Sequence, residues 1–504
     1  MNNRCDVLVI GAGGAGLTAA LHAKESGADV MVLTKEYPTR SQTCMAQGGM
    51  NAALGNAGED SVEDHIANTL KSAQGEADEE AIRFMCSEAP NAVEWLDSIG
   101  VCFSRTKDAK IAQRTLGGAS APRACYAQDY TGLKILHTIY DRCLEADIEM
   151  RNEKYLLGLL KDKKGSVCGA EVLDIHSGEV EIYEANAVIL ASGGYSRIYD
   201  KNSTNSTAST GDGIAVAARA GAKLIDMEFV QFHPTGLKNS SILISESARG
   251  EGGHLLNSKG ERFTNELAPR DVLSRAINNA IQKGEDVFLD IRHLGETLID
   301  EGLPQERKLA KLYENVDPVH EIIPIRPVAH YTMGGIEVDH KSASSVQGLF
   351  ACGECANHRV HGANRLGGNS LLEIVVFGKE AGKNAALYAK EHTENREQIS
   401  TLTDIQKIKE YENSLDFYVK KEELGNLFYK NVGIVRTKEQ LKEALDAVKE
   451  IKANVHKYGV SDKSKEYNTN FVEFLEFLNT LDVCEAVVSG ALGREVSCGA
   501  HYIV

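Results

Sequence analysis

The chain has 504 residues, of which 42% are hydrophobic and 25% charged, as in ordinary globular proteins. Its length suits several domains of ~150 residues each, and its composition excludes a disordered or low-complexity protein. Fifty-five basic against 72 acidic residues give a net charge of −17, which disfavours nucleic-acid binding.

The cysteines and the apolar runs indicate the cellular compartment. Eleven irregularly spaced cysteines are typical of the free thiols of a cytosolic protein and not of a disulfide framework. The longest apolar runs, around 187–191 and 371–378, fall short of the ~18 residues of a membrane span. Strand structure is expected from residue 5, which leaves no room for a signal or transit peptide. We therefore expect a cytoplasmic protein without a membrane span of its own.

The first predicted elements are a strand, a glycine turn, a helix and a second strand. Residues 5–10 and 28–33 are apolar runs, and 17–24 is rich in Ala and Leu. The turn reads Gly11-x-Gly13-x-x-Gly16, the dinucleotide-binding spacing, in which glycines let backbone N–H groups approach a pyrophosphate. The motif alone does not choose NAD over FAD. It occurs once, which disfavours an enzyme that holds two nucleotides.

Later segments extend this sheet and add two further regions. Apolar runs at 187–191 and 348–352, each followed by glycine, predict one sheet assembled from distant parts of the chain. From about 222 to 339 the pattern is mixed and turn-rich, as in an inserted domain. Residues 403–418 and 437–458 have apolar residues at helical spacing, which predicts a helical C-terminal domain.

Six further motifs follow one another along the chain: Pro38-Thr39-Arg40-Ser41-Gln42-Thr43, Ala46-Gln47-Gly48-Gly49, Phe229-Val230-Gln231-Phe232-His233-Pro234-Thr235-Gly236, Arg249-Gly250-Glu251-Gly252-Gly253, His330-Tyr331-Thr332-Met333-Gly334-Gly335 and His361-Gly362-Ala363-Asn364-Arg365-Leu366-Gly367-Gly368-Asn369-Ser370-Leu371. Together they resemble the flavoprotein subunit of succinate dehydrogenase and fumarate reductase. The resemblance runs from residue 5 to about 380 and returns weakly at 493–502.

This resemblance implies an α/β fold. It has a Rossmann-like FAD-binding domain at 1–221 and 339–392, an inserted α+β capping domain at 222–338 and a helical domain at 393–504. It implies that FAD is bound by Gly11, Gly13, Gly14, Ala15, Gly16, Thr34, Lys35, Ser41, Gln42, Thr43, Gln47, Gly48, Gly49, Asp212, Glu354, Ser370 and Leu371. Carboxylates suit ribose and ribityl hydroxyls as acceptors. For Asp212 the alternative is a helix N-cap, because an Ala-rich run follows.

A four-carbon dianion needs cationic and hydrogen-bonding partners at both ends, and arginine and histidine supply them. By resemblance, His233, Ser245, His330 and Arg365 bind the two carboxylates. A lone histidine is more often structural, but each of these lies within a matching motif. Ser245 stands where the family usually has threonine and keeps the hydroxyl.

Arg270 matches the family's proton-donating arginine. A guanidinium is a very weak acid, so it donates only to a strongly basic centre. Hydride addition from flavin N5 to one alkene carbon creates such a centre on the other carbon, provided that water is excluded. By resemblance, Glu246 and Arg249 relay protons to Arg270. The alternative for these two is an ordinary surface ion pair three residues apart on a helix.

The chain also departs from the family at Gln42 and near its C-terminal end. Gln42 replaces the histidine that links FAD covalently in many relatives, so we expect non-covalent FAD, a lower flavin potential and a preference for fumarate reduction. Cys498 replaces an arginine near the end, and the chain stops at Val504, which puts contacts with a partner subunit in doubt. Cys352 and Cys355 have redox or metal spacing but lie in the predicted FAD turn, so we expect no metal site.

Two other functions remain as alternatives. L-aspartate oxidase shares several motifs, but it usually has a glutamate for the substrate ammonium where this chain has Leu116. An electron-relay flavoprotein would have no use for the dicarboxylate residues. No ferredoxin-like cysteine run occurs, so the resemblance implies a separate iron–sulfur subunit and allows a membrane-associated anchor beyond it.

Overall fold

The computed structural model describes residues 3–393, 399–400 and 405–504. Its largest sheet has the strand order β18–β7–β8–β9–β1–β2–β6, with β16 paired to β9. These strands are β1 (Arg4–Ile10), β2 (Val30–Leu33), β6 (Glu149–Arg151), β7 (Lys154–Lys161), β8 (Val167–Asp174), β9 (Val180–Leu190), β16 (Leu349–Ala351) and β18 (Ile399–Ser400).

The sheet joins distant segments, as the apolar runs predict. Val188 of β9 pairs in parallel with both Leu8 of β1 and Leu349 of β16. All three side chains are buried, because both faces of this part of the sheet are covered. The three glycine-terminated strands therefore end together at one edge of the sheet.

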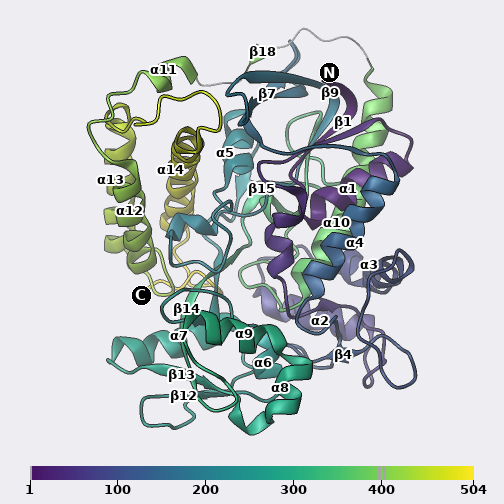
Figure 1. The fold of residues 1–504 in the computed structure, drawn as a ribbon, viewed down its shortest axis with the longest axis vertical. Helices are drawn as coiled ribbons and strands as arrows, with labels where there is room; N and C mark the ends of the chain where they lie inside the picture. Colours follow the sequence, from purple (N-terminus) through teal and green to yellow (C-terminus); the bar gives the residue numbers. More distant parts are fainter. Residues whose placement is uncertain (1–2, 394–398, 401–404) are drawn as a thin grey trace.

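Helices cover the sheet near this edge (Figure 1). α1 (Gly14–Glu25) and α10 (Asn369–Glu391) pack against the strands, α4 (Thr131–Glu145) packs on α1, and α3 (Glu79–Ser98) and α2 (Val62–Ala73) lie beyond α10. A Cβ atom at Gly382 of α10 would lie 2.2 Å from the carbonyl oxygen of Ala19. Glycine therefore allows the close approach of α10 to α1.

A second sheet lies at the bottom of Figure 1 and falls within the segment predicted as an inserted domain. Its order is β11 (Val230–Leu237), β14 (Ile323–Thr332), β13 (Val287–Asp290) and β12 (His254–Leu256). The helices around it are α6 (Glu246–Gly250), α7 (Arg270–Gln282), α8 (Glu296–Gly302) and α9 (Pro304–Tyr313). It has its own buried apolar cluster, which includes Leu273, Ile277 and Leu289. The exact domain boundaries stay a prediction.

Small sheets complete the framework. One has the order β10 (Leu224–Ile225), β15 (Gly335–Glu337) and β17 (Ala356–Asn357), and the other β3 (Met50–Asn51), β5 (Ala124–Cys125) and β4 (Gln113–Arg114). The described part of the chain contains no helix long and apolar enough to cross a bilayer.

The C-terminal region is helical. Helices α12 (Phe417–Asn431), α13 (Lys438–Ala453) and α14 (Thr469–Gly493) lie side by side (Figure 1). The helix expected at 437–458 is confirmed over 438–453, and the side chains of Thr437 and Gln440 form a capping box at its start. This reciprocal pair satisfies two backbone donors that the first helical turn leaves open.

The helix expected at 403–418 is wrong over most of its length. Residues 403–404 lie outside the described residues, α11 (Ile405–Lys409) is short, and 410–416 are not helical. Asn413 adopts a left-handed φ of 52°, and the Asp416 side chain accepts a hydrogen bond from the backbone of Tyr418. Local side-chain capping therefore starts a new helix at Phe417 and overrides the apolar spacing.

Candidate active site

A cavity is lined both by the first glycine turn and by residues of β11, α6 and α7. Predicted FAD residues that line it are Gly11, Gly13, Gly14, Ala15, Thr34, Lys35, Ser41, Gln42, Thr43, Gln47, Gly48, Gly49, Asp212, Glu354, Ser370 and Leu371. Gly16 does not line it. A Cβ atom there would lie 1.9 Å from the carbonyl oxygen of Gly11, so Gly16 serves the packing of α1 against the turn.

The polar atoms of this cavity fit FAD. Ser41 Oγ, both amide atoms of Gln47, Ser192 Oγ and Asn205 Nδ2 are buried without a hydrogen-bond partner in the described residues, and all four residues line the cavity. Helix α1 begins after Gly13 without a side-chain cap. Its positive N-terminal end therefore suits the pyrophosphate, and the unpaired groups suit the remaining polar atoms of the cofactor.

Asp212 does not act as a helix N-cap. Gly211 holds that position, and no side chain caps α5 (Asp212–Arg219). The Asp212 carboxylate instead accepts hydrogen bonds from Tyr155 Oη at 2.8 Å and Asn479 Nδ2 at 2.8 Å. Its contact with FAD stays a prediction.

Lys35 links the cofactor region to the C-terminal helices. Its Nζ lies 2.8 Å from Asp212 and 2.6 Å from Glu476 of α14. Burial opposes the charge on Lys35, but the two carboxylates outweigh it and raise the pKa of Lys35. This side chain is therefore held by carboxylates of the protein.

Glu354 follows β16 and lines the cavity. One of its oxygens accepts hydrogen bonds from the backbone and the hydroxyl of Thr332, at 2.9 and 3.1 Å. Burial raises the pKa of Glu354 to about 7. Without a ligand, Glu354 therefore changes between its protonated and its ionised form near neutral pH.

The pairing of β11 with β14 brings His233 and His330 together, with ring centroids 4.9 Å apart. The backbone N–H of Thr235 donates to His233 Nδ1 at 3.3 Å, so the ring proton lies on Nε2 and is free for a ligand. Burial, and then the charge of Arg270, lower the pKa of both histidines well below the ordinary value. Both rings are therefore neutral hydrogen-bonding groups at pH 7.

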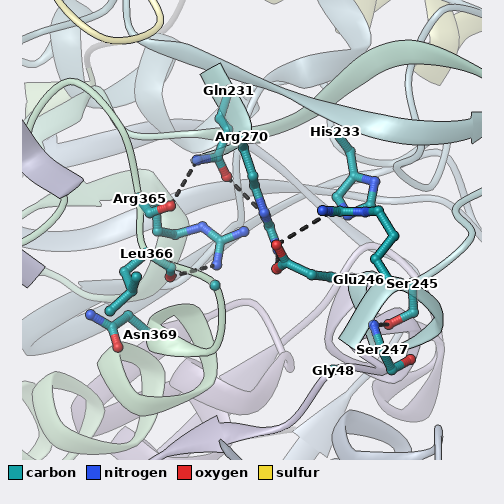
Figure 2. Close-up of polar contacts among 12 residues, drawn as sticks. Gly48, Gln231, His233, Ser245, Glu246, Ser247, Arg270, Arg365, Leu366 and Asn369 are labelled. Carbon is teal, nitrogen blue, oxygen red and sulfur yellow. Dashed lines mark hydrogen bonds and ion pairs between the residues drawn. The ribbon is translucent and has the colours of Figure 1, made fainter. Parts of the chain in front are cut away.

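Arg270, Glu246 and Arg249 form a buried chain of hydrogen bonds. Figure 2 shows Arg270 and Glu246 facing each other. Arg270 Nη2 donates to Glu246 Oε2 at 2.7 Å, and Arg249 Nη2 lies 3.3 Å from Glu246 Oε1. Burial favours the neutral form of Glu246, but Arg270 and then Arg249 outweigh it and lower its pKa. The pair of Glu246 and Arg249 is not on the surface. Arg249 does not line the cavity, so it can act only through Glu246.

Arg365 supplies an unbalanced positive charge. It is buried and lines the cavity, its guanidinium stacks 4.3 Å from the centroid of the Tyr331 ring, and it has no carboxylate partner in the described chain. Burial and then Arg270 lower its pKa to about 10, so it stays charged at neutral pH. Arg249 and Arg270 share the carboxylate of Glu246, and Arg365 pairs with none, which leaves an excess of positive charge for an anion.

Two residues of the site were not assigned a role from the sequence. Gln231 accepts a hydrogen bond from Arg270 Nη1 at 2.9 Å and donates to the carbonyl of Arg365 at 2.8 Å, so it sets the spacing of the two arginines (Figure 2). Tyr331 carries the stacked Arg365. Both lie within motifs that mark the region, but only the fold shows what they touch.

The position that discriminates against L-aspartate oxidase is apolar. Leu116 is buried and lines the cavity. It offers no negative charge to a substrate ammonium group. Ser245, the remaining predicted substrate residue, lines the cavity and is the N-cap of α6.

Two family models together match most of the chain. The model of the FAD binding domain matches residues 6–371, and the model of the fumarate reductase flavoprotein C-terminus matches residues 421–503.

The succinate dehydrogenase flavoprotein subunit of Rickettsia bellii is 38% identical over 540 residues, covering 99% of this chain and 90% of that protein. The 8-methylmenaquinol:fumarate reductase flavoprotein subunit of Wolinella succinogenes is 39% identical over 523 residues, covering 99% and 85%. A solved quinol-fumarate reductase with menaquinol molecules is similar with a TM-score of 0.94 and 36% identity, covering 100% of this chain and 93% of that one. The chain is therefore an FAD-dependent oxidoreductase and belongs to the family of flavoprotein subunits of succinate dehydrogenase and fumarate reductase.

Proposed function

We propose that this chain reduces fumarate to succinate in preference to the reverse reaction. The observation that carries the proposal is the buried excess of guanidinium groups beside two neutral histidines. A small dicarboxylate supplies two negative charges, and Arg365 offers a planar fork for one of its carboxylates. The Nε2–H of His233 and the side chains of Ser245 and His330 are the proposed hydrogen-bonding groups for the substrate.

Arg270 is the proposed proton donor. When bound, FAD supplies the hydride for one alkene carbon, and the protein must deliver a proton to the other. Arg270 lines the cavity and keeps one hydrogen bond to Glu246. A proton lost to the substrate is therefore replaced through Glu246 from Arg249, in two hydrogen-bonded steps.

Gln42 underlies the proposed direction and the proposed non-covalent cofactor. Its side-chain oxygen accepts a hydrogen bond from the backbone of Ser206 at 2.8 Å, and an amide cannot form the histidyl bond to FAD. Without that electron-withdrawing bond, the flavin potential is lower and electron donation to fumarate is favoured. Acid precipitation of the holoenzyme should leave FAD in the supernatant, whereas FAD in the pellet would contradict this proposal.

The test of function uses the FAD-loaded protein with fumarate and reduced viologen, and separately with succinate and an oxidising dye. We expect faster fumarate reduction. Malonate, a small dicarboxylate, should bind in the site and change the absorbance of the bound flavin. We expect this change to be lost in Arg365→Gln. Absence of both fumarate reduction and malonate binding in a fully loaded protein would refute the proposal, and oxidation of aspartate by oxygen would replace it.

We also propose an iron–sulfur partner chain, because the electrons must reach FAD and the relatives are named as subunits. The sequence contains no cysteine run of its own for a cluster. Purification from the native source should yield a complex with the absorbance of an iron–sulfur protein. A cytoplasmic location stays a prediction.

A further inference from the structure

Two buried carboxyl groups meet at the N-terminus of α9, outside the chain of residues proposed for catalysis. Glu306 lies in the first turn of α9, and Asp129 lies just before α4; both are fully buried. Asp129 Oδ2 accepts hydrogen bonds from the backbone N–H groups of Gln305 at 2.7 Å and Glu306 at 3.4 Å. Asp129 therefore caps α9 from a distant segment. Burial raises the pKa of Asp129, while its hydrogen bonds to the backbone at the start of α9 and the helix dipole favour its ionised form.

Glu306 contacts the substrate segment, by which we mean Ser245 and the start of α6. Its Oε1 accepts a hydrogen bond from the backbone N–H of Ser245 at 3.1 Å. Ser245 lines the cavity and caps α6, the short helix that carries Glu246 and Arg249. Through this one bond, Glu306 helps to fix the residue from which α6 starts.

The other oxygens of the pair have no hydrogen-bond partner. Glu306 Oε2 and Asp129 Oδ1 are both buried and unpaired, and neither carboxyl forms an ion pair in the described part of the chain. Arg114 is the cation whose charge acts on both carboxyl groups, but it donates its hydrogen bonds to the carbonyls of Gly48, Gln47 and Gln128. Two ionised carboxylates are not stable in such a site, because burial and mutual repulsion both oppose the second charge.

The remaining neighbours do not supply a counter-charge. The titratable groups around the pair and Arg114 are Tyr126, Tyr130 and Glu251. Arg307, which follows Glu306 on α9, is held by Asp317, Asp300 and Glu296. Burial and then the charge of Asp129 raise the pKa of Glu306 well above its ordinary value.

We infer that Glu306 is held as a neutral carboxylic acid and acts as a positioning residue for Ser245, while Asp129 carries the negative charge. Ionisation of Glu306 would place a second negative charge behind the substrate segment and weaken the binding of a dicarboxylate. The effect on substrate rests on the proposed function, but the protonation state of Glu306 does not.

The protonation state can be measured directly in the FAD-loaded protein at pH 7 by infrared spectroscopy. The difference between the wild type and Glu306→Gln should contain the carbonyl stretch of a protonated carboxylic acid, shifted in D₂O. The exposed matched control Glu301→Gln should show no such difference. A difference spectrum that contains only ionised carboxylate bands would overturn the inference, whether or not the enzyme reduces fumarate.

The positioning role is tested by the pH dependence of KM for fumarate. KM should rise in the wild type as the pH passes the pKa of Glu306, and this rise should be absent in Glu306→Gln. Asp129→Asn removes the negative neighbour and lowers the pKa of Glu306, so the rise should occur at lower pH. A rise that persists unchanged in Glu306→Gln would overturn the role. Complete absence of fumarate reduction would instead count against the proposed function.

Discussion

Glu246 sits between two glycines that come from different parts of the chain. A Cβ atom at Gly117 would lie 2.4 Å from Glu246 Oε1, and one at Gly367 would lie 2.4 Å from Oε2. Because the end of a glutamate side chain moves easily, a methyl group at either position would displace the carboxylate without unfolding the protein. The hydrogen bond to Arg270 would then be lost.

We therefore predict that Gly117→Ala lowers kcat for fumarate reduction by roughly 100-fold, since small misplacements of catalytic groups have effects of this order. Bound FAD should be retained, because Gly117 does not line the cavity. Gly493→Ala is the matched control, since a Cβ atom there meets nothing within 4 Å. The measurements are steady-state kinetics and the flavin content per chain. An unchanged kcat in Gly117→Ala would show that the position of the Glu246 carboxylate does not limit fumarate reduction.

A second prediction at the residue scale concerns Glu354, whose pKa is about 7. An ionised carboxylate is the better acceptor for a cofactor hydroxyl, so the affinity for FAD should increase as the pH rises from 6 to 8. The increase cannot exceed about tenfold per pH unit for one group. Fluorescence titration of the apoprotein should show this dependence in the wild type. Glu354→Gln should bind FAD with a constant affinity over the same range, and an equal dependence in both proteins would exclude Glu354 as its source.

At the scale of the elements, Lys35, Asp212 and Glu476 form a buried ionic cluster, the Lys35 cluster. It links the end of β2 to α5 and α14. Replacement of Lys35 by Met would leave Asp212 and Glu476 buried without their cation. We predict a loss of roughly 3–5 kcal/mol in the free energy of unfolding, the usual effect of breaking a buried ion pair. Urea denaturation of the FAD-loaded protein should detect it. Lys201→Met, which breaks the exposed pair with Glu422, should cost less than about 1 kcal/mol; similar losses in both variants would contradict the prediction.

The strands of the sheet could be predicted from the sequence, whereas the Lys35 cluster could not. The first glycine turn and the strands at β1, β9 and β16 were predictable, because long apolar runs bounded by glycine have few other interpretations. The motifs also located most of the cavity. The bond between Lys35 and Glu476 spans 441 residues and has no local pattern. The failed helix at 403–418 has a similar cause, since capping by single polar side chains outweighs a weak periodicity.

At the scale of the whole molecule, the last residues join two regions that lie far apart in the sequence. His501 is fully buried and lies 3.0 Å from Arg436 Nη1, just before α13. Nearby, the carbonyl of Gly499 accepts a hydrogen bond from Arg275 of α7, the helix that begins at Arg270. The C-terminal segment therefore holds the helix of the proposed proton donor.

Deletion of residues 499–504 should thus lower the thermal midpoint and the rate of fumarate reduction together. The loss of His501, one of several hydrogen-bond partners of the buried Arg436, should alone cost about 1–3 kcal/mol. Thermal unfolding of the truncated holoenzyme, compared with Glu495→Ala at an exposed side chain just before the deleted residues, measures the effect. A truncated enzyme with normal activity and stability would show that this segment is dispensable.

The sheet in which β9 lies between β1 and β16 also governs when the protein can acquire its cofactor during synthesis. The walls of the cavity extend from Ile10 to Ile374, and Glu476 joins Lys35 later still. A nascent chain that has emerged only as far as the first glycine turn offers FAD one edge of a strand and a single helix end. Capture of the cofactor must therefore wait until the ribosome has released most of the polypeptide, which makes flavin loading a late step of biogenesis.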